Sequence, residues 1–196
     1  MANTPSIWFT LAQRLGGQYV RTGQFGSVTL KARGGTICLE RVPFGTQHSD
    51  GSSHKTRMSA SYLPLNDFTF SVCSNTPLQR VVTLFGMLDI KVGEPGFDSS
   101  FVVRANGPQT VRKLLADDVM RRTLLGVHEN CWLTIESRDR FKEGAAGLAT
   151  VFGSRRVIVW ERVGLEDDEQ RLSAMFEVFV RLLGPLCDLG LADPDG

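Results

Sequence analysis

The sequence predicts an α+β protein in which helices cover one face of an antiparallel β-sheet. Three observations favour this fold class. Short β-prone runs follow one another as hairpins through residues 18–73 instead of alternating with helices, unlike a doubly wound fold. Apolar and polar residues alternate along several runs, which is typical of a sheet with one solvated face. Residues 172–186 place apolar side chains at three- and four-residue spacing, the pattern of a long C-terminal amphipathic helix.

The N-terminal segment predicts a helix that packs on this sheet. Thr4 can cap the helix, Pro5 suits its first position, and Gly16 with Gly17 ends it. Its apolar residues fall on one face: Ile7, Trp8, Leu11 and Leu15.

Strand signals dominate the next part of the chain. Five runs predict strands: residues 18–21, 27–32, 36–42, 55–63 and 67–73. Gly34 and Gly35 indicate a hairpin between the second and third runs. Residues 45–54 contain no core-forming residue and predict a solvated loop.

The rest of the chain mixes helix and strand signals. Strands are predicted over residues 101–104, 131–136 and 156–162. One helix is expected from Asn106 to Leu115, and Asp117 or Asp118 can cap a second that runs to Leu125. The last helix follows four acidic residues, 166–169, which suit the positive end of a helix dipole.

Length and composition predict one domain, residues 1–190, with a disordered tail at 191–196. A coarse echo of strands followed by helices allows two similar halves, about residues 18–125 and 131–190.

The net charge of +1 provides no field that would attract nucleic acid or an anionic membrane. Because a secretory signal and an apolar run of about 20 residues are both missing, we expect a soluble, cytoplasmic protein.

Several classes of chemistry lack their sequence signals. The four cysteines, Cys38, Cys73, Cys131 and Cys187, lie far apart among apolar neighbours, which predicts reduced, buried thiols. The chain has no CxxC pair, P-loop, GxGxxG or GxSxG motif. These observations predict no cofactor and favour a protein that is not an enzyme.

A histidine-containing loop is the best candidate for a metal site. His48, Asp50 and His54 fall within seven residues of one another. Their spacing matches no rigid metal-binding pattern, and a solvated loop supplies little preorganisation. We therefore expect surface histidines and no metal.

The most specific segment runs from Phe85 to Val103. It contains the pattern FGxxDIxxGxPxFDxxF over residues 85–101, and a Thr-Arg-x-x-Ala strand precedes it at residues 56–60. This pattern resembles that of a bacterial cytosolic family of unknown function, and it is loosely similar to the soluble region of DUF3137-type proteins. The resemblance implies a shared fold over residues 8–190, and it implies no catalytic residue, substrate or cofactor.

The acidic turn within this segment is the candidate ligand-binding site. Asp89, Glu94 and Asp98 crowd the turn, and Arg57 and Arg104 are expected on neighbouring strands. Carboxylates beside basic groups can transfer protons or bind a polar ligand. The alternative is structural, because an Asp in a Gly- and Pro-rich turn usually accepts hydrogen bonds from backbone N–H groups.

The leading functional prediction is a non-enzymatic binding or protein-interaction module, whose partner is another protein or a second copy in a homodimer. Val178 widens the apolar stripe of the last helix, and a free sheet edge would offer a second surface. The alternatives are an enzyme of unfamiliar type and a polar small-ligand sensor, both using the acidic turn. Arg138, Arg140 and Lys142 could form a basic patch, but the near-neutral chain predicts no nucleic-acid partner.

Overall fold

The computed structural model describes residues 6–22, 25–43, 54–75, 88–127, 132–137 and 155–195. Within them the helices are α1 (Ile7–Leu15), α2 (Pro95–Ser100), α3 (Pro108–Leu114), α4 (Asp118–Gly126) and α5 (Glu169–Asp188). The strands are β1 (Gln18–Thr22), β2 (Phe25–Ala32), β3 (Gly35–Pro43), β4 (His54–Tyr62), β5 (Phe70–Ser74), β6 (Leu88–Ile90), β7 (Phe101–Ala105), β8 (Trp132–Ser137) and β9 (Arg156–Val163). Predictions for Thr4, Pro5, His48, Asp50, Phe85, Gly86, Cys131 and residues 138–142 lie outside the described residues.

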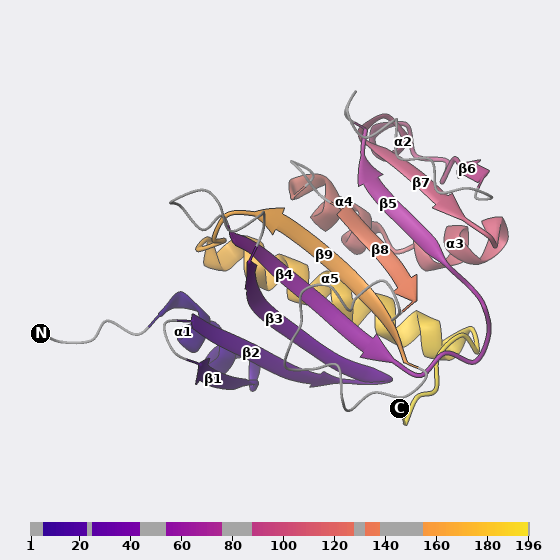
Figure 1. Ribbon diagram of the computed structural model, residues 1–196. Coiled ribbons are helices and arrows are strands. Elements are labelled where there is room, and N and C mark those ends of the chain that lie inside the picture. Colours follow the sequence, from indigo (N-terminus) through magenta and orange to yellow (C-terminus); the bar gives the residue numbers. More distant parts are fainter. Residues whose placement is uncertain are drawn as a thin grey trace, which may run out of the picture.

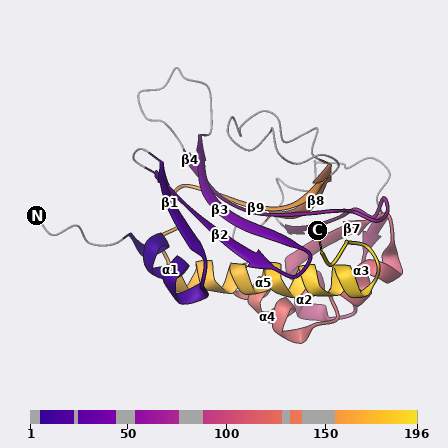
Figure 2. The same ribbon diagram turned by 90° about the horizontal axis from the view of Figure 1, so that it is seen from below.

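The nine described strands form one antiparallel sheet, and the helices gather on one of its faces (Figures 1 and 2). The strand order is β1-β2-β3-β4-β9-β8-β5-β7-β6. Buried apolar side chains from the strands and from α1, α3, α4 and α5 make a single core between the two layers. The predicted α+β class with helices on one face is therefore confirmed.

Strands β8 and β9 lie in the middle of the sheet although they come late in the chain. They pair with each other, and then β9 pairs with β4 while β8 pairs with β5. The two predicted halves thus share one sheet, because β8 and β9 separate β4 from β5.

Helix α1 begins later than predicted. Ser6 is its N-cap, and the hydroxyl of Ser6 accepts a hydrogen bond from the Phe9 N–H at 3.2 Å. Gly16 ends the helix as predicted, in the left-handed conformation with φ 69°. The indole N–H of Trp8 donates to the carbonyl of Glu166 at 3.1 Å, which links α1 to the segment that precedes α5.

Helix α5 runs beneath the sheet and is covered on several sides. Asp168 caps it by accepting hydrogen bonds from the N–H groups of Gln170 and Arg171. Val178, predicted to widen an outer apolar face, is fully buried, and α5 is in contact with α1, α3, α4 and β3. Eight apolar residues of α5 are buried in the core, whereas Val180 is 45% exposed. None of the described helices has the length and apolar character needed to cross a membrane.

Three local predictions are wrong. Residues 95–100 form the short helix α2 where a turn was predicted, because Pro95 at its first position already has the φ angle that a helix needs. Residues 67–69 precede β5 instead of belonging to it. The tail predicted to be disordered packs on the fold: Ala192 is fully buried, and the Asp193 N–H donates to the Leu63 carbonyl at 3.0 Å.

Candidate functional site

The acidic turn between β6 and α2 is closed by Asp98. One carboxylate oxygen of Asp98 accepts from the Val92 N–H at 2.8 Å, and the other accepts from the Gly93 N–H at 3.0 Å. Gly93 has a φ of 101°, a conformation that favours glycine. Both carboxylate oxygens of Asp98 thus accept hydrogen bonds from backbone N–H groups. This is the structural role that the sequence analysis gave as the alternative to ligand binding.

The other two acids of the turn form ion pairs with arginines. Asp89 faces Arg104 across β6 and β7, with Oδ1 and Nε 2.6 Å apart. Glu94 lies 2.7 Å from Nε of Arg121, whose guanidinium also donates to the Leu115 carbonyl at 2.6 Å. These contacts tie the turn to β7 and α4.

The fifth predicted residue, Arg57, lies in another part of the sheet. It is on β4, and β9, β8, β5 and β7 separate that strand from β6. Five strand spacings correspond to about 24 Å. The structure therefore brings Asp89 to Arg104 and keeps Glu94 and Asp98 in the adjoining turn, whereas Arg57 is remote from all four.

Arg57 instead belongs to a central charge cluster of Glu40, Lys55, Arg57 and Glu161, on β3, β4 and β9. Nη2 of Arg57 lies 2.6 Å and its Nε 2.7 Å from Oε1 of Glu161, while Lys55 holds Oε2 at 3.0 Å. Glu40 lies farther away, 3.8 Å from Nη1 of Arg57. Glu40, Arg57 and Glu161 are direct neighbours across the three strands. They alternate with core residues, so the cluster faces away from the helices.

The two carboxylates of the central charge cluster respond differently to their surroundings. Burial raises the pKa of Glu40, because the pull of Arg57 in the opposite direction is weaker. Burial also acts to raise the pKa of Glu161, but Arg57 and Lys55 together outweigh it and hold this pKa below the ordinary value. The cluster therefore favours the ionised form of Glu161 and disfavours the ionised form of Glu40. Sequence inspection could not find it, since Arg57 and Glu161 are 104 positions apart.

Two of the cysteines that the structure describes, Cys38 and Cys73, have little nucleophilic character. The sequence predicts buried thiols, and in the structure Cys38, Cys73 and Cys187 are only half-buried. Burial raises the pKa of Cys38 to about 12 and that of Cys73 to about 11. A thiol attacks as its thiolate, so both groups are poorly suited to covalent chemistry near neutral pH.

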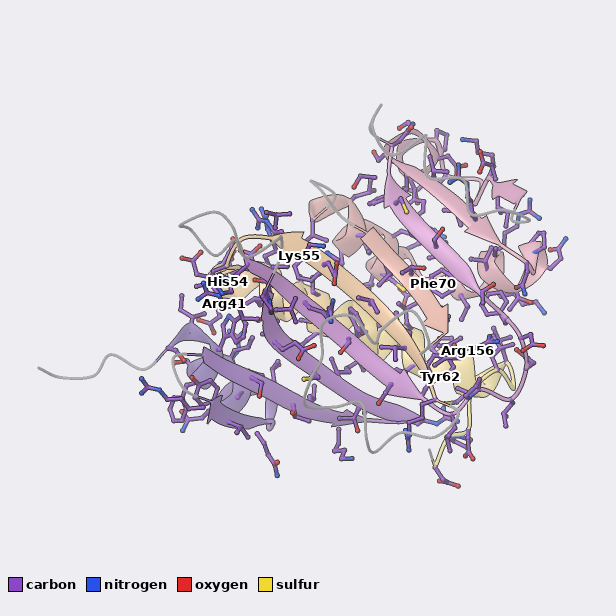
Figure 3. All side chains as sticks on the ribbon, in the orientation of Figure 1. Arg41, His54, Lys55, Tyr62, Phe70 and Arg156 are labelled. Carbon is purple, nitrogen blue, oxygen red and sulfur yellow. The ribbon has the colours of Figure 1, made fainter. Side chains whose placement is uncertain are left out.

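His54 belongs to a strand instead of the predicted loop. It is the first residue of β4, and its Nδ1 lies 2.8 Å from Nη2 of Arg41 on β3 (Figure 3). Among the residues that the structure describes, no three His, Cys, Asp or Glu side chains come together as they would around a metal ion. Arg156, which lies beside Tyr62 at the other end of β4 in Figure 3, pairs with Asp67 at 2.9 Å.

The two outermost strands differ in the surface they present. At one end, β1 is five residues long and its central residue, Val20, is 53% exposed. At the other end, β6 has three residues and carries the Asp89 ion pair. The β1 end is thus the longer of the two edges of the described sheet, and it exposes an apolar side chain at its centre.

Comparisons with protein-family models, curated proteins and solved structures give no match to the chain. The resemblance to a family of unknown function and to DUF3137-type proteins stays a prediction. Functional conclusions therefore depend on the geometry of the described residues.

Proposed function

We propose that the protein is a non-enzymatic protein-interaction module and that its first partner is a second copy of the same chain. The observation that carries this proposal is the β1 end of the sheet. Among the strands that the structure describes, β1 has a neighbour on one side alone. Such an edge can pair with another strand, and Val20 adds exposed apolar surface at its centre.

The predicted chemical groups support the same reading because they already have structural tasks. Asp98 holds two backbone N–H groups, and Asp89 and Glu94 each pair with an arginine. The raised pKa values of Cys38 and Cys73 make nucleophilic catalysis by these thiols unfavourable. A module that binds through backbone and apolar surface needs none of these groups for chemistry.

Light scattering after size exclusion tests the proposal. Over about 1 to 200 µM protein, the mass should rise above the 21.6 kDa of one chain as concentration increases. The rise should persist in about 1 M NaCl, because salt screens charge contacts far more than backbone hydrogen bonds or apolar contacts. A single-chain mass at every concentration would overturn the proposal.

A further inference from the structure

The β1 edge lacks most of the features that protect an edge strand from pairing with another strand. Protective features include Pro, bulges, very short strands and inward charges. β1 pairs with β2 over five consecutive residues without a break, from Gln18 with Thr29 to Thr22 with Phe25. It contains no Pro, and its one charged residue, Arg21, is exposed and lies on the same face of the strand as Tyr19. In contrast, the three-residue β6 carries a charge at its centre, Asp89. Of the two ends of the described sheet, β1 is therefore the one suited to accept another strand.

The sequence of β1 is self-complementary in one antiparallel register. If a two-fold axis passes through Val20, Val20 meets its own counterpart, Tyr19 lies opposite Arg21, and Gln18 lies opposite Thr22. The two valines provide an apolar pair on the axis, and the aromatic ring lies beside a cation. This register places no two like charges opposite each other. Shifting the axis by one residue to Arg21 would place two guanidinium groups opposite each other, which is unfavourable.

The helix behind β1 extends the surface available to such a pair. Phe9 of α1 and Tyr19 of β1 are both half-buried, and their rings meet edge to face with centroids 5.7 Å apart. Tyr19 covers Gly26 of β2, since a Cβ at that glycine would lie 2.3 Å from the ring. These aromatic side chains therefore lie on the helix side of the edge. A second copy would find apolar surface there in addition to the backbone edge.

We propose that two copies of the chain join their sheets edge to edge through β1, antiparallel and with Val20 on the two-fold axis. This inference rests on the proposed function and specifies its surface. The product is a continuous sheet across both copies, with the helices of both on the same face. Because a five-residue edge with a few apolar side chains is a small interface, the dimer dissociates at micromolar concentrations.

The first test introduces a positive charge at Val20, the residue on the proposed two-fold axis. Val20→Lys sets two ammonium groups opposite each other and should raise the dissociation constant at least about tenfold. Val20→Thr keeps the β-branched shape and should stay within about threefold of the wild type. Because Val20 is 53% exposed, both variants should keep the thermal midpoint of the wild-type fold, which a melt verifies.

The second test is a disulfide that forms in only one register. Residues directly opposite in a sheet have Cα atoms about 4.5–5.5 Å apart, within the range that a disulfide spans. Val20→Cys should therefore cross-link to its counterpart on oxidation. In Gln18→Cys the two positions would be about 13 Å apart along the strand, so this matched variant should not cross-link. Trypsin releases position 20 in the peptide of residues 15–21, which mass spectrometry would detect linked to itself. Wild-type protein oxidised in parallel measures the background from the native cysteines.

The outcomes separate this inference from the proposed function. A concentration-dependent wild-type dimer, weakened by Val20→Lys and trapped by Val20→Cys alone, supports both. A wild-type dimer that Val20→Lys leaves intact, or that Gln18→Cys traps as well as Val20→Cys does, overturns the β1 interface and leaves self-association standing. A wild-type chain that is monomeric throughout overturns both.

Discussion

Removing the positive charge of Arg57 should destabilise the fold through the two carboxylates beside it. In the central charge cluster the guanidinium contacts Oε1 of Glu161 through two nitrogens and approaches Glu40 at 3.8 Å. Arg57→Met keeps most of the side-chain stem while deleting the charge. Glu40 and Glu161 would then repel each other without the cation between them.

The expected loss in free energy of unfolding is about 2–3 kcal/mol at pH 7. Breaking a fully buried pair costs about 3–5 kcal/mol. We expect a smaller loss here for two reasons. The four side chains of the cluster are between 14% and 26% exposed, and Lys55 still forms an ion pair with Glu161. For a chain of this size the thermal midpoint should fall by about 4–12 °C.

Urea unfolding followed by tryptophan fluorescence measures this loss. Arg33→Met is the matched control, because Arg33 and Asp188 form a pair whose side chains are 58% and 62% exposed. The control should stay within about 0.5 kcal/mol of the wild type. Glu161→Gln combined with Arg57→Met should recover part of the loss, since the double variant removes one carboxylate.

The same experiment at low pH checks the electrostatic cause. Arg57 helps to lower the pKa of Glu161 below 4.5, so the stability gained from this pair is present above pH 4.5 and is lost as the pH falls through the folded-state pKa. The difference between the wild type and Arg57→Met should therefore shrink below about pH 4.5. A loss under about 0.5 kcal/mol at pH 7, or a loss equal at both pH values, would refute the reasoning.

Three further outcomes are expected. Asp98→Ala should lower the free energy of unfolding by about 1–2 kcal/mol. Asp98→Asn should lower it by less, because the amide oxygen still accepts one hydrogen bond. A loss for Asp98→Ala no larger than that for Asp89→Ala, at an exposed position, would count against the turn-closing role of Asp98. Burial raises the pKa of Glu40, so the stability of the wild type falls as the pH rises from 4.5 through that pKa. The stability of Glu40→Gln relative to the wild type should therefore be greater at pH 7 than at pH 4. Urea melts showing the opposite trend would contradict this sign. Peptide mapping after iodoacetamide treatment near pH 8 should show Cys38 and Cys73 alkylated at least about tenfold more slowly than in urea, and equal rates would contradict their raised pKa values.

Local elements could be predicted because their signals act within a few residues. Gly16 ends α1, Asp117 caps α4, and β8 and β9 fall on two predicted β-prone runs. The helix α2 was missed because Pro95 and Gly96 are typical of turns as well as of a helix start. Residue type alone could not decide between these uses.

Contacts between distant parts of the chain could not be predicted. The sequence suggests that β4 and β5 are neighbours, yet β9 and β8 lie between them. Consequently Arg57 could not be assigned its partner Glu161, and it was grouped with the acidic turn instead. The Asp89–Arg104 pair was accessible to sequence reasoning because β6 and β7 are close in the chain. Long-range pairing depends on the total packing of the core, which no local pattern encodes.

The central position of β8 and β9 sets the order in which a nascent chain can complete its fold. When a ribosome has released residues up to Gly126, β4 and β5 each still lack the neighbour that the finished sheet gives them. Their unpaired edges stay open to other nascent chains until Val163 has emerged. We therefore expect chaperones to hold the chain until late in translation. A polypeptide cut short before Arg156 should aggregate instead of folding in part.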